Sequence, residues 1–173
     1  MKTETDKIIQ FTLLYNRYKK RLYNFLLKLS NDRMTAEDIT QSVFLKLFEN
    51  FESLQNKGSA NFWIFRTARN EYYNYYKREK RKSEINENII STKQDEFELE
   101  SYIELKEMKK IILSELDKME IEQKEVYLLK EYGGLSYKEI SETLDIEVKL
   151  VKSRLYKTRQ KLIDRISKKI IER

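Results

Sequence analysis

The side chains with the clearest chemical potential lie near the C-terminus, in residues 149–161. This stretch holds six Lys and Arg residues and no Asp or Glu. Lys and Arg neutralise phosphates or donate hydrogen bonds to guanine edges, and Ser can do either. If the stretch is a helix, its outward face presents a set suited to duplex DNA: Lys149, Lys152, Ser153, Tyr156, Lys157 and Arg159. The chemistry indicated is the binding of a polyanion.

A second basic stretch, residues 66–82, mixes cations with aromatic rings. Its basic residues outnumber its acidic ones by seven to two. Such a mixture suits single-stranded bases, because stacking on a ring contributes roughly 1–3 kcal/mol per base. At helical spacing the apolar side chains form one face: Phe65, Ala68, Tyr72 and Tyr76. The polar face is the candidate for function: Arg66, Asn70, Tyr73 and Lys77.

Between the two basic stretches lies an acidic one. Residues 84–104 hold seven Asp and Glu residues against Lys93 alone, and show no convincing period. Two basic segments separated by an acidic one suggest two polyanion-binding modules on a tether. Two solvated helix faces would give the same charge pattern, so charge alone leaves both interpretations open.

Composition restricts the fold and the chemistry. The 173 residues include no Pro and three Gly, which favours helices joined by short connections. The absence of Cys and His excludes disulfides, zinc sites of the usual kind and His-based acid–base catalysis. No apolar run is long enough to span a bilayer, and the first ten residues lack a signal-peptide pattern. We therefore expect a cytoplasmic protein without membrane insertion.

Apolar periodicity predicts helices over about residues 8–29, 36–51, 60–82, 102–116 and 121–132. Thr35 is the expected N-cap of the second, with Asp38 three residues later. Gly133 and Gly134 are expected to end the fifth. Ser136 and Glu139 then form a capping-box pattern that starts a short helix, a turn follows at 145–147, and a longer basic helix comes next. This order describes a helix-turn-helix.

Four stretches resemble sigma factors of the extracytoplasmic-function type, within the sigma-70 family. Their order and separation match the family over about residues 11–162. The stretches are Ala36–Leu47, Phe62–Asn70, Lys77–Arg81, and Gly134–Ile140 with Val151–Leu155. The resemblance implies an all-α fold of two small helical domains joined by an acidic linker. It places a polymerase-docking and −10-reading domain in residues 1–82, the linker in 83–104, and a −35-reading helix-turn-helix domain in 105–173.

The resemblance also implies partners and residue roles. The partners are core RNA polymerase and promoter DNA; an anti-sigma factor is a further partner that it leaves open. No cofactor, metal or catalytic residue is implied. The second helix would dock on polymerase through four side chains: Asp38, Gln41, Phe44 and Leu45. Asn70 falls where the family holds a flipped −10 base, on the same face as Arg66, Tyr73 and Lys77.

Two rival functions remain to be weighed. A stand-alone helix-turn-helix regulator would bind DNA as a dimer without polymerase, but it leaves the aromatic and basic third helix and the acidic tether unexplained. An enzyme acting on nucleic acid would need a carboxylate cluster for metal. Glu37 and Asp38 are adjacent in sequence, so on a helix they face different directions and make a poor pair.

Overall fold

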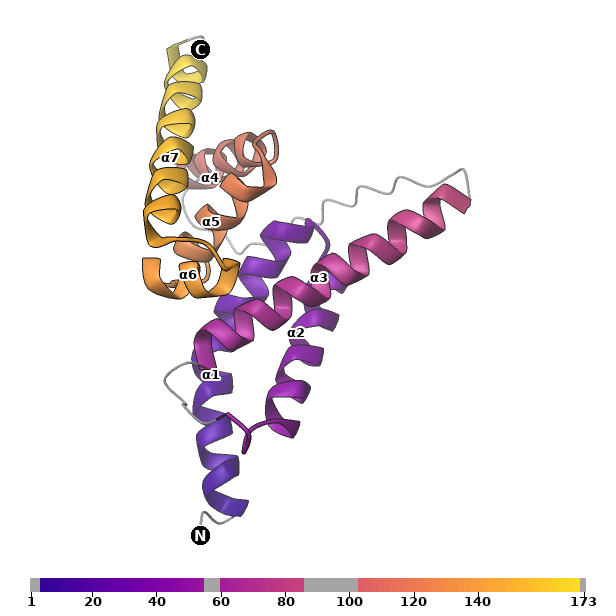
Figure 1. Ribbon diagram of the computed structural model, residues 1–173. Helices are drawn as coiled ribbons and strands as arrows, with labels where there is room; N and C mark the ends of the chain where they lie inside the picture. The colour runs from indigo at the N-terminus through magenta and orange to yellow at the C-terminus, as the bar shows by residue number, and fades with distance from the viewer. Residues whose placement is uncertain (1–3, 55–59, 86–102, 172–173) are drawn as a thin grey trace.

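The computed structural model describes residues 4–54, 60–85 and 103–171, and in that part of the chain every regular element is an α-helix (Figure 1). The helices are α1 (Glu4–Ser30), α2 (Arg33–Glu49), α3 (Ala60–Ile85), α4 (Ile103–Leu116), α5 (Ile121–Glu131), α6 (Tyr137–Leu144) and α7 (Val148–Ile171). The all-α fold predicted from composition is confirmed. The middle of the predicted linker, residues 86–102, lies outside the described residues, and its ends continue α3 and begin α4.

Helices α1, α2 and α3 form the first unit. α1 packs along α2, and α3 crosses both, so that their apolar faces share one core. The largest side chains in it are fully buried rings and aliphatic groups: Leu22, Phe25, Leu26, Leu47 and Phe65. Phe25 and Phe65 meet edge to face, with ring centroids 5.6 Å apart. This core holds α3 by its apolar face and leaves another side of the helix free to carry function.

The start of α2 differs from the expectation. Thr35 does not cap the helix; Asp32 is the N-cap, and its carboxylate accepts hydrogen bonds from the Thr35 amide (2.8 Å) and the Thr35 hydroxyl. A carboxylate at this position also interacts favourably with the positive end of the helix dipole. Thr35 is therefore a buried residue of the first turn, and α2 begins earlier than predicted.

Helices α4 to α7 form the second unit, and here the sequence expectations hold. Gly134 adopts φ +67° after the end of α5, a conformation that costs glycine little. The capping box is present: the Glu139 amide donates to Ser136 Oγ (3.2 Å) and the Ser136 amide donates to Glu139 Oε2 (2.7 Å). Asp145, in the left-handed region at φ +55°, turns the chain from α6 into α7.

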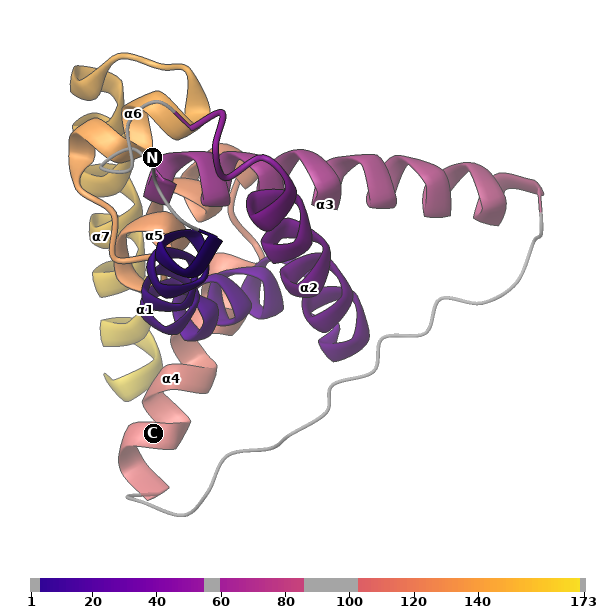
Figure 2. The same cartoon turned by 90° about the horizontal axis from the view of Figure 1, so that it is seen from below.

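The two units lie against each other, although the charge pattern had suggested separate modules. α3 contacts α6 and α1 contacts α5. Gly133 allows this approach, because a Cβ there would lie 3.1 Å from a ring carbon of Phe65 and 2.6 Å from the Leu129 carbonyl. The C-terminal half of α3 projects beyond the other helices (Figure 2). That half exposes Tyr75 and Tyr76 to solvent.

Candidate nucleic-acid interface

The polar face of α3 is a solvent-facing surface. Arg66, Asn70 and Lys77 are all exposed, and they recur at intervals of four and seven residues, which places them along one side of the helix. The structure thus brings three of the four predicted −10 residues together. Of the predicted apolar face, Phe65 and Ala68 are buried and Tyr72 is half-buried, but Tyr76 is 55% exposed, because it lies in the half of α3 that projects beyond the other helices (Figure 2).

Tyr73, the fourth predicted −10 residue, faces the second unit. Its ring lies under the guanidinium of Arg69, 4.8 Å from the ring centroid. Burial raises the pKa of its hydroxyl, and the neighbouring Glu125 carboxylate raises that pKa further. With its ring against Arg69 and its hydroxyl near Glu125, Tyr73 is engaged within the protein in this arrangement.

Arg69 and Glu125 join the two units directly. Arg69 Nε lies 2.8 Å from Glu125 Oε1, and Nη2 lies 3.2 Å from Oε2, so the pair is bidentate. The Glu125 side chain is only 3% exposed. The stability of so deeply buried a carboxylate depends on its cationic partner, because removing Arg69 would leave an uncompensated buried charge. Sequence reasoning did not identify Glu125, which looks like an ordinary acidic residue of an amphipathic helix.

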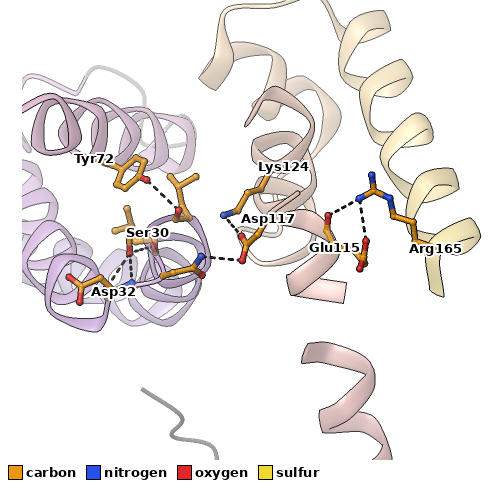
Figure 3. Close-up of polar contacts among 10 residues, drawn as sticks. Ser30, Asp32, Tyr72, Glu115, Asp117, Lys124 and Arg165 are labelled. Atoms are coloured by element: carbon orange, nitrogen blue, oxygen red, sulfur yellow. Dashed lines mark hydrogen bonds and ion pairs between the residues drawn. The ribbon is translucent and has the colours of Figure 1, made fainter. Parts of the chain in front are cut away.

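Two further polar contacts join the units, Asn31–Asp117 and Asn61–Glu139. Together with the Arg69–Glu125 pair, we call them the interdomain contact. The Asn31 side-chain amide donates to Asp117 Oδ2 (3.2 Å), and Lys124 reaches Asp117 Oδ1 at 2.7 Å (Figure 3). The Asn61 amide donates to Glu139, the acidic member of the capping box. Both ends of the contact are thus polar, around a buried apolar centre at Phe65.

The outward face of α7 is a second cationic surface. Five of the six predicted −35 residues are exposed and Ser153 is half-buried; the exposed five are Lys149, Lys152, Tyr156, Lys157 and Arg159. Of these five, Arg159 pairs with Glu131 on α5 at 2.8 Å. Lys152 lies over the Tyr137 ring, 5.8 Å from its centroid. Most of the predicted set therefore shares one accessible face.

Buried residues on the other side hold α7 in place. Val151, Leu155, Thr158 and Leu162 are buried and form the inward stripe. Near the C-terminal end, Arg165 Nη1 donates to the main-chain oxygen and the Oε2 atom of Glu115 on α4, both at 3.3 Å (Figure 3). Packing on one side and this charged contact fix the direction in which the cationic face points.

The predicted polymerase-docking residues on α2 divide between surface and core. Asp38, Gln41 and Leu45 are exposed, and Leu45 leaves 66% of its surface to solvent, a high fraction for an apolar side chain. Phe44 is 3% exposed, and its ring meets that of Tyr15 at 4.8 Å between centroids. The structure thus places Phe44 in the core, under the surface that the other three form.

Comparisons with known proteins give one consistent answer. The family model "Sigma-70 region 2" matches residues 14–82, and "Sigma-70, region 4" matches residues 109–162. The chain is 31% identical over 151 residues to the ECF RNA polymerase sigma factor SigM of Bacillus subtilis, covering 86% of this chain and 90% of that protein. It is 27% identical over 157 residues to the RNA polymerase sigma factor YlaC of the same organism, with 90% and 91% covered.

Solved structures resemble the fold as a whole. One is the sigma factor RpoE of Bartonella quintana in complex with the anti-sigma factor NepR, with a TM-score of 0.74 at 21% identity over 91% of this chain and 96% of that one. Another is CnrH in complex with the cytosolic domain of CnrY, with a TM-score of 0.64 at 18% identity over 95% and 98%. Among the described helices, none has the length and apolar character of a membrane-spanning segment.

Proposed function

This chain belongs to the extracytoplasmic-function type of the sigma-70 family, and we propose how its two domains divide the recognition of a promoter between them. It is an RNA polymerase sigma factor that acts in transcription initiation. The observation that carries the division is the presence of two exposed cationic surfaces on different helices, one on α3 and one on the second helix of the helix-turn-helix, α7.

The exposed face of α3 reads the melted −10 element. Asn70 holds a base that has left the stack, and Arg66 and Lys77 neutralise the adjacent phosphates. Flipping a base costs a few kcal/mol of unstacking, so a protein must supply compensating contacts. Tyr73 adds its ring once it is released from Glu125. The exposure of the three polar residues and the position of Tyr73 on the same helix support this assignment.

The exposed face of α7 reads the −35 element as duplex DNA. The second helix of a helix-turn-helix enters the major groove, and the residues near its N-terminus reach base edges. Lys152 and Ser153 lie within the first two turns and are placed for base or phosphate contacts, and Tyr156 and Lys157 follow one turn later. Arg159 pairs with Glu131 and so lies at the margin of this surface.

The exposed part of α2 binds core polymerase through Asp38, Gln41 and Leu45, and Phe44 supports that surface from within. We assign the chain no catalytic step: its role is contact with DNA and polymerase, and we place it in the cytoplasm where the polymerase works. Because the two solved relatives above are complexes with NepR and with CnrY, we also propose that an anti-sigma factor controls this chain.

The test uses purified protein with core RNA polymerase. We expect the protein to co-elute with the core enzyme on gel filtration and to direct run-off transcription from fragments that the core enzyme alone ignores. Failure to bind the core enzyme would refute the proposal for α2. Initiation that does not depend on the −10 or the −35 sequence would refute the proposals for α3 and α7.

A further inference from the structure

Two apolar side chains in the first turn of α7, Val148 and Leu150, do not fit a purely cationic surface, and Leu150 is the more exposed of the two. Leu150 leaves 40% of its surface to solvent, in the first turn of the helix. The Leu150 amide donates to the Glu147 carbonyl (2.9 Å), and the next amide does the same (3.1 Å). These bonds make Glu147 the N-cap, so Leu150 occupies the third helical position.

Leu150 contributes nothing visible to the core of the described chain. The inward stripe of α7 begins with Val151, and Leu150 belongs neither to the buried cluster nor to the partly buried residues packed against it. Helix propensity does not explain it either, since Lys or Glu would serve a helix nearly as well without exposing apolar surface. Its exposed neighbours include the charged Lys149 and Lys152 and the apolar Val148.

The position of Leu150 matches a chemical feature of DNA. Residues near the N-terminus of a recognition helix meet base edges in the major groove. There, the C5-methyl group of thymine is the apolar feature that distinguishes one base from the others, and apolar side chains contact it. Lys149 and Lys152 would hold the flanking phosphates and bring the helix close enough for this contact.

We propose that Leu150 is a specificity-determining residue that reads the methyl group of a thymine in the −35 element. The inference rests on the proposed −35 function of α7 and adds the base class that one position prefers. Binding would bury the Leu150 side chain together with that one methyl group. Removing that methyl group should lower initiation from the promoter roughly three- to fourfold, as the burial of one such group predicts.

The experiment measures initiation by the reconstituted holoenzyme on a promoter selected from genomic fragments. Each thymine of the −35 element is replaced in turn by deoxyuridine, which removes the methyl and nothing else. With the wild-type protein we expect one replacement to lower initiation roughly three- to fourfold. Leu150→Ala should start lower and lose sensitivity to that replacement, while Leu150→Met should retain it.

Ile163→Ala provides the matched control, because Ile163 is a 55% exposed apolar residue on the same helix, far from its N-terminus. This variant should respond to deoxyuridine as the wild type does.

The inference is overturned, while the proposed function stands, if initiation depends on the −35 element but deoxyuridine has no effect on it. The same holds if deoxyuridine lowers initiation by Leu150→Ala as much as initiation by the wild type. If Leu150→Ala lowers initiation equally on promoters lacking a −35 element, Leu150 contacts protein and the inference also fails. If the −35 element itself is irrelevant to the wild type, the proposed function fails first.

Discussion

Arg69 on α3 and Glu125 on α5 form a bidentate ion pair that joins the unit of α1–α3 to the unit of α4–α7, with N–O distances of 2.8 and 3.2 Å. Glu125 also lies near the hydroxyl of Tyr73, a predicted −10 residue, and raises the pKa of that hydroxyl. The same carboxylate therefore joins the two units and lies beside one residue of the proposed −10 surface. In the proposed function, Tyr73 has to leave Glu125 before its ring can contact DNA.

Removing Arg69 should open the interdomain contact. Arg69→Ala leaves the Glu125 carboxylate buried without its cation, which we expect to weaken the contact by about 3 kcal/mol. Because the chain contains no Cys, spin labels can be attached at Arg78→Cys and Lys138→Cys, both exposed sites. The distance between the labels should lengthen and broaden in the variant.

Lys82→Ala is the control for this measurement, because Lys82 pairs with Glu79 on the exposed surface of α3 alone (2.9 Å). Surface pairs of this kind contribute little, so the distance distribution should match that of the parent protein. An unchanged distribution in Arg69→Ala would show that the ion pair does not hold the domains together.

Asn70→Ala should impair promoter opening and leave polymerase binding intact. The side chain is exposed on α3 and supports no core packing, so its loss removes a DNA contact without unfolding the domain. We expect permanganate reactivity of the −10 thymines to fall by about tenfold, because the flipped base loses a compensating contact. Asn16→Ala, at an exposed site on α1, should leave the footprint unchanged. An unaltered footprint in Asn70→Ala would refute the assigned role.

Lys152→Ala should weaken initiation selectively. On promoters that depend on a −35 element we expect about a tenfold loss, within the range for one base or phosphate contact. Promoters that do without the element should be unaffected. Lys168→Ala removes an exposed Lys near the other end of α7 and should behave as the wild type. Equal losses on both classes of promoter would contradict a −35 role for Lys152.

Leu45 and Phe44 should give opposite phenotypes although they are neighbours on α2. Leu45→Ala removes an exposed side chain, so we expect weaker binding to core polymerase, by about tenfold or 1.4 kcal/mol, with an unchanged melting temperature. Phe44→Ala leaves a cavity beside Tyr15 and should lower the free energy of unfolding by about 3–5 kcal/mol. A stable Phe44→Ala variant with weakened polymerase binding would reverse this division.

The sequence predicts the parts of this fold that local chemistry determines. The helices follow from apolar periodicity, and the Ser136 capping box is found with both of its hydrogen bonds. Local rules fail where two candidates compete within one turn. Asp32 and Thr35 can both cap α2, and the carboxylate does so. Phe44 and Leu45 are adjacent apolar residues, and only the packing of α1 decides which is buried.

The relation between the domains is the part that the sequence does not predict. Glu125 lies 56 residues from Arg69, and nothing in the pattern around either residue indicates a pair. In the sequence, a carboxylate that another domain will cover looks the same as one that stays in solvent. Tyr73 shares the helical face of Arg66 and Asn70, but the approach of α5 buries it in part.

In the proposed function, α3 and α7 of one molecule contact the melted −10 element and the duplex −35 element in the same complex. Photocrosslinking in the open complex tests it directly, with benzoylphenylalanine at Tyr156 on α7 and at Asn74, an exposed position one turn after Asn70. The probe at position 156 should crosslink to the −35 duplex and the probe at position 74 to the non-template strand of the −10 element. Crosslinks from both positions to the same element, or from position 74 to duplex DNA alone, would contradict the claim.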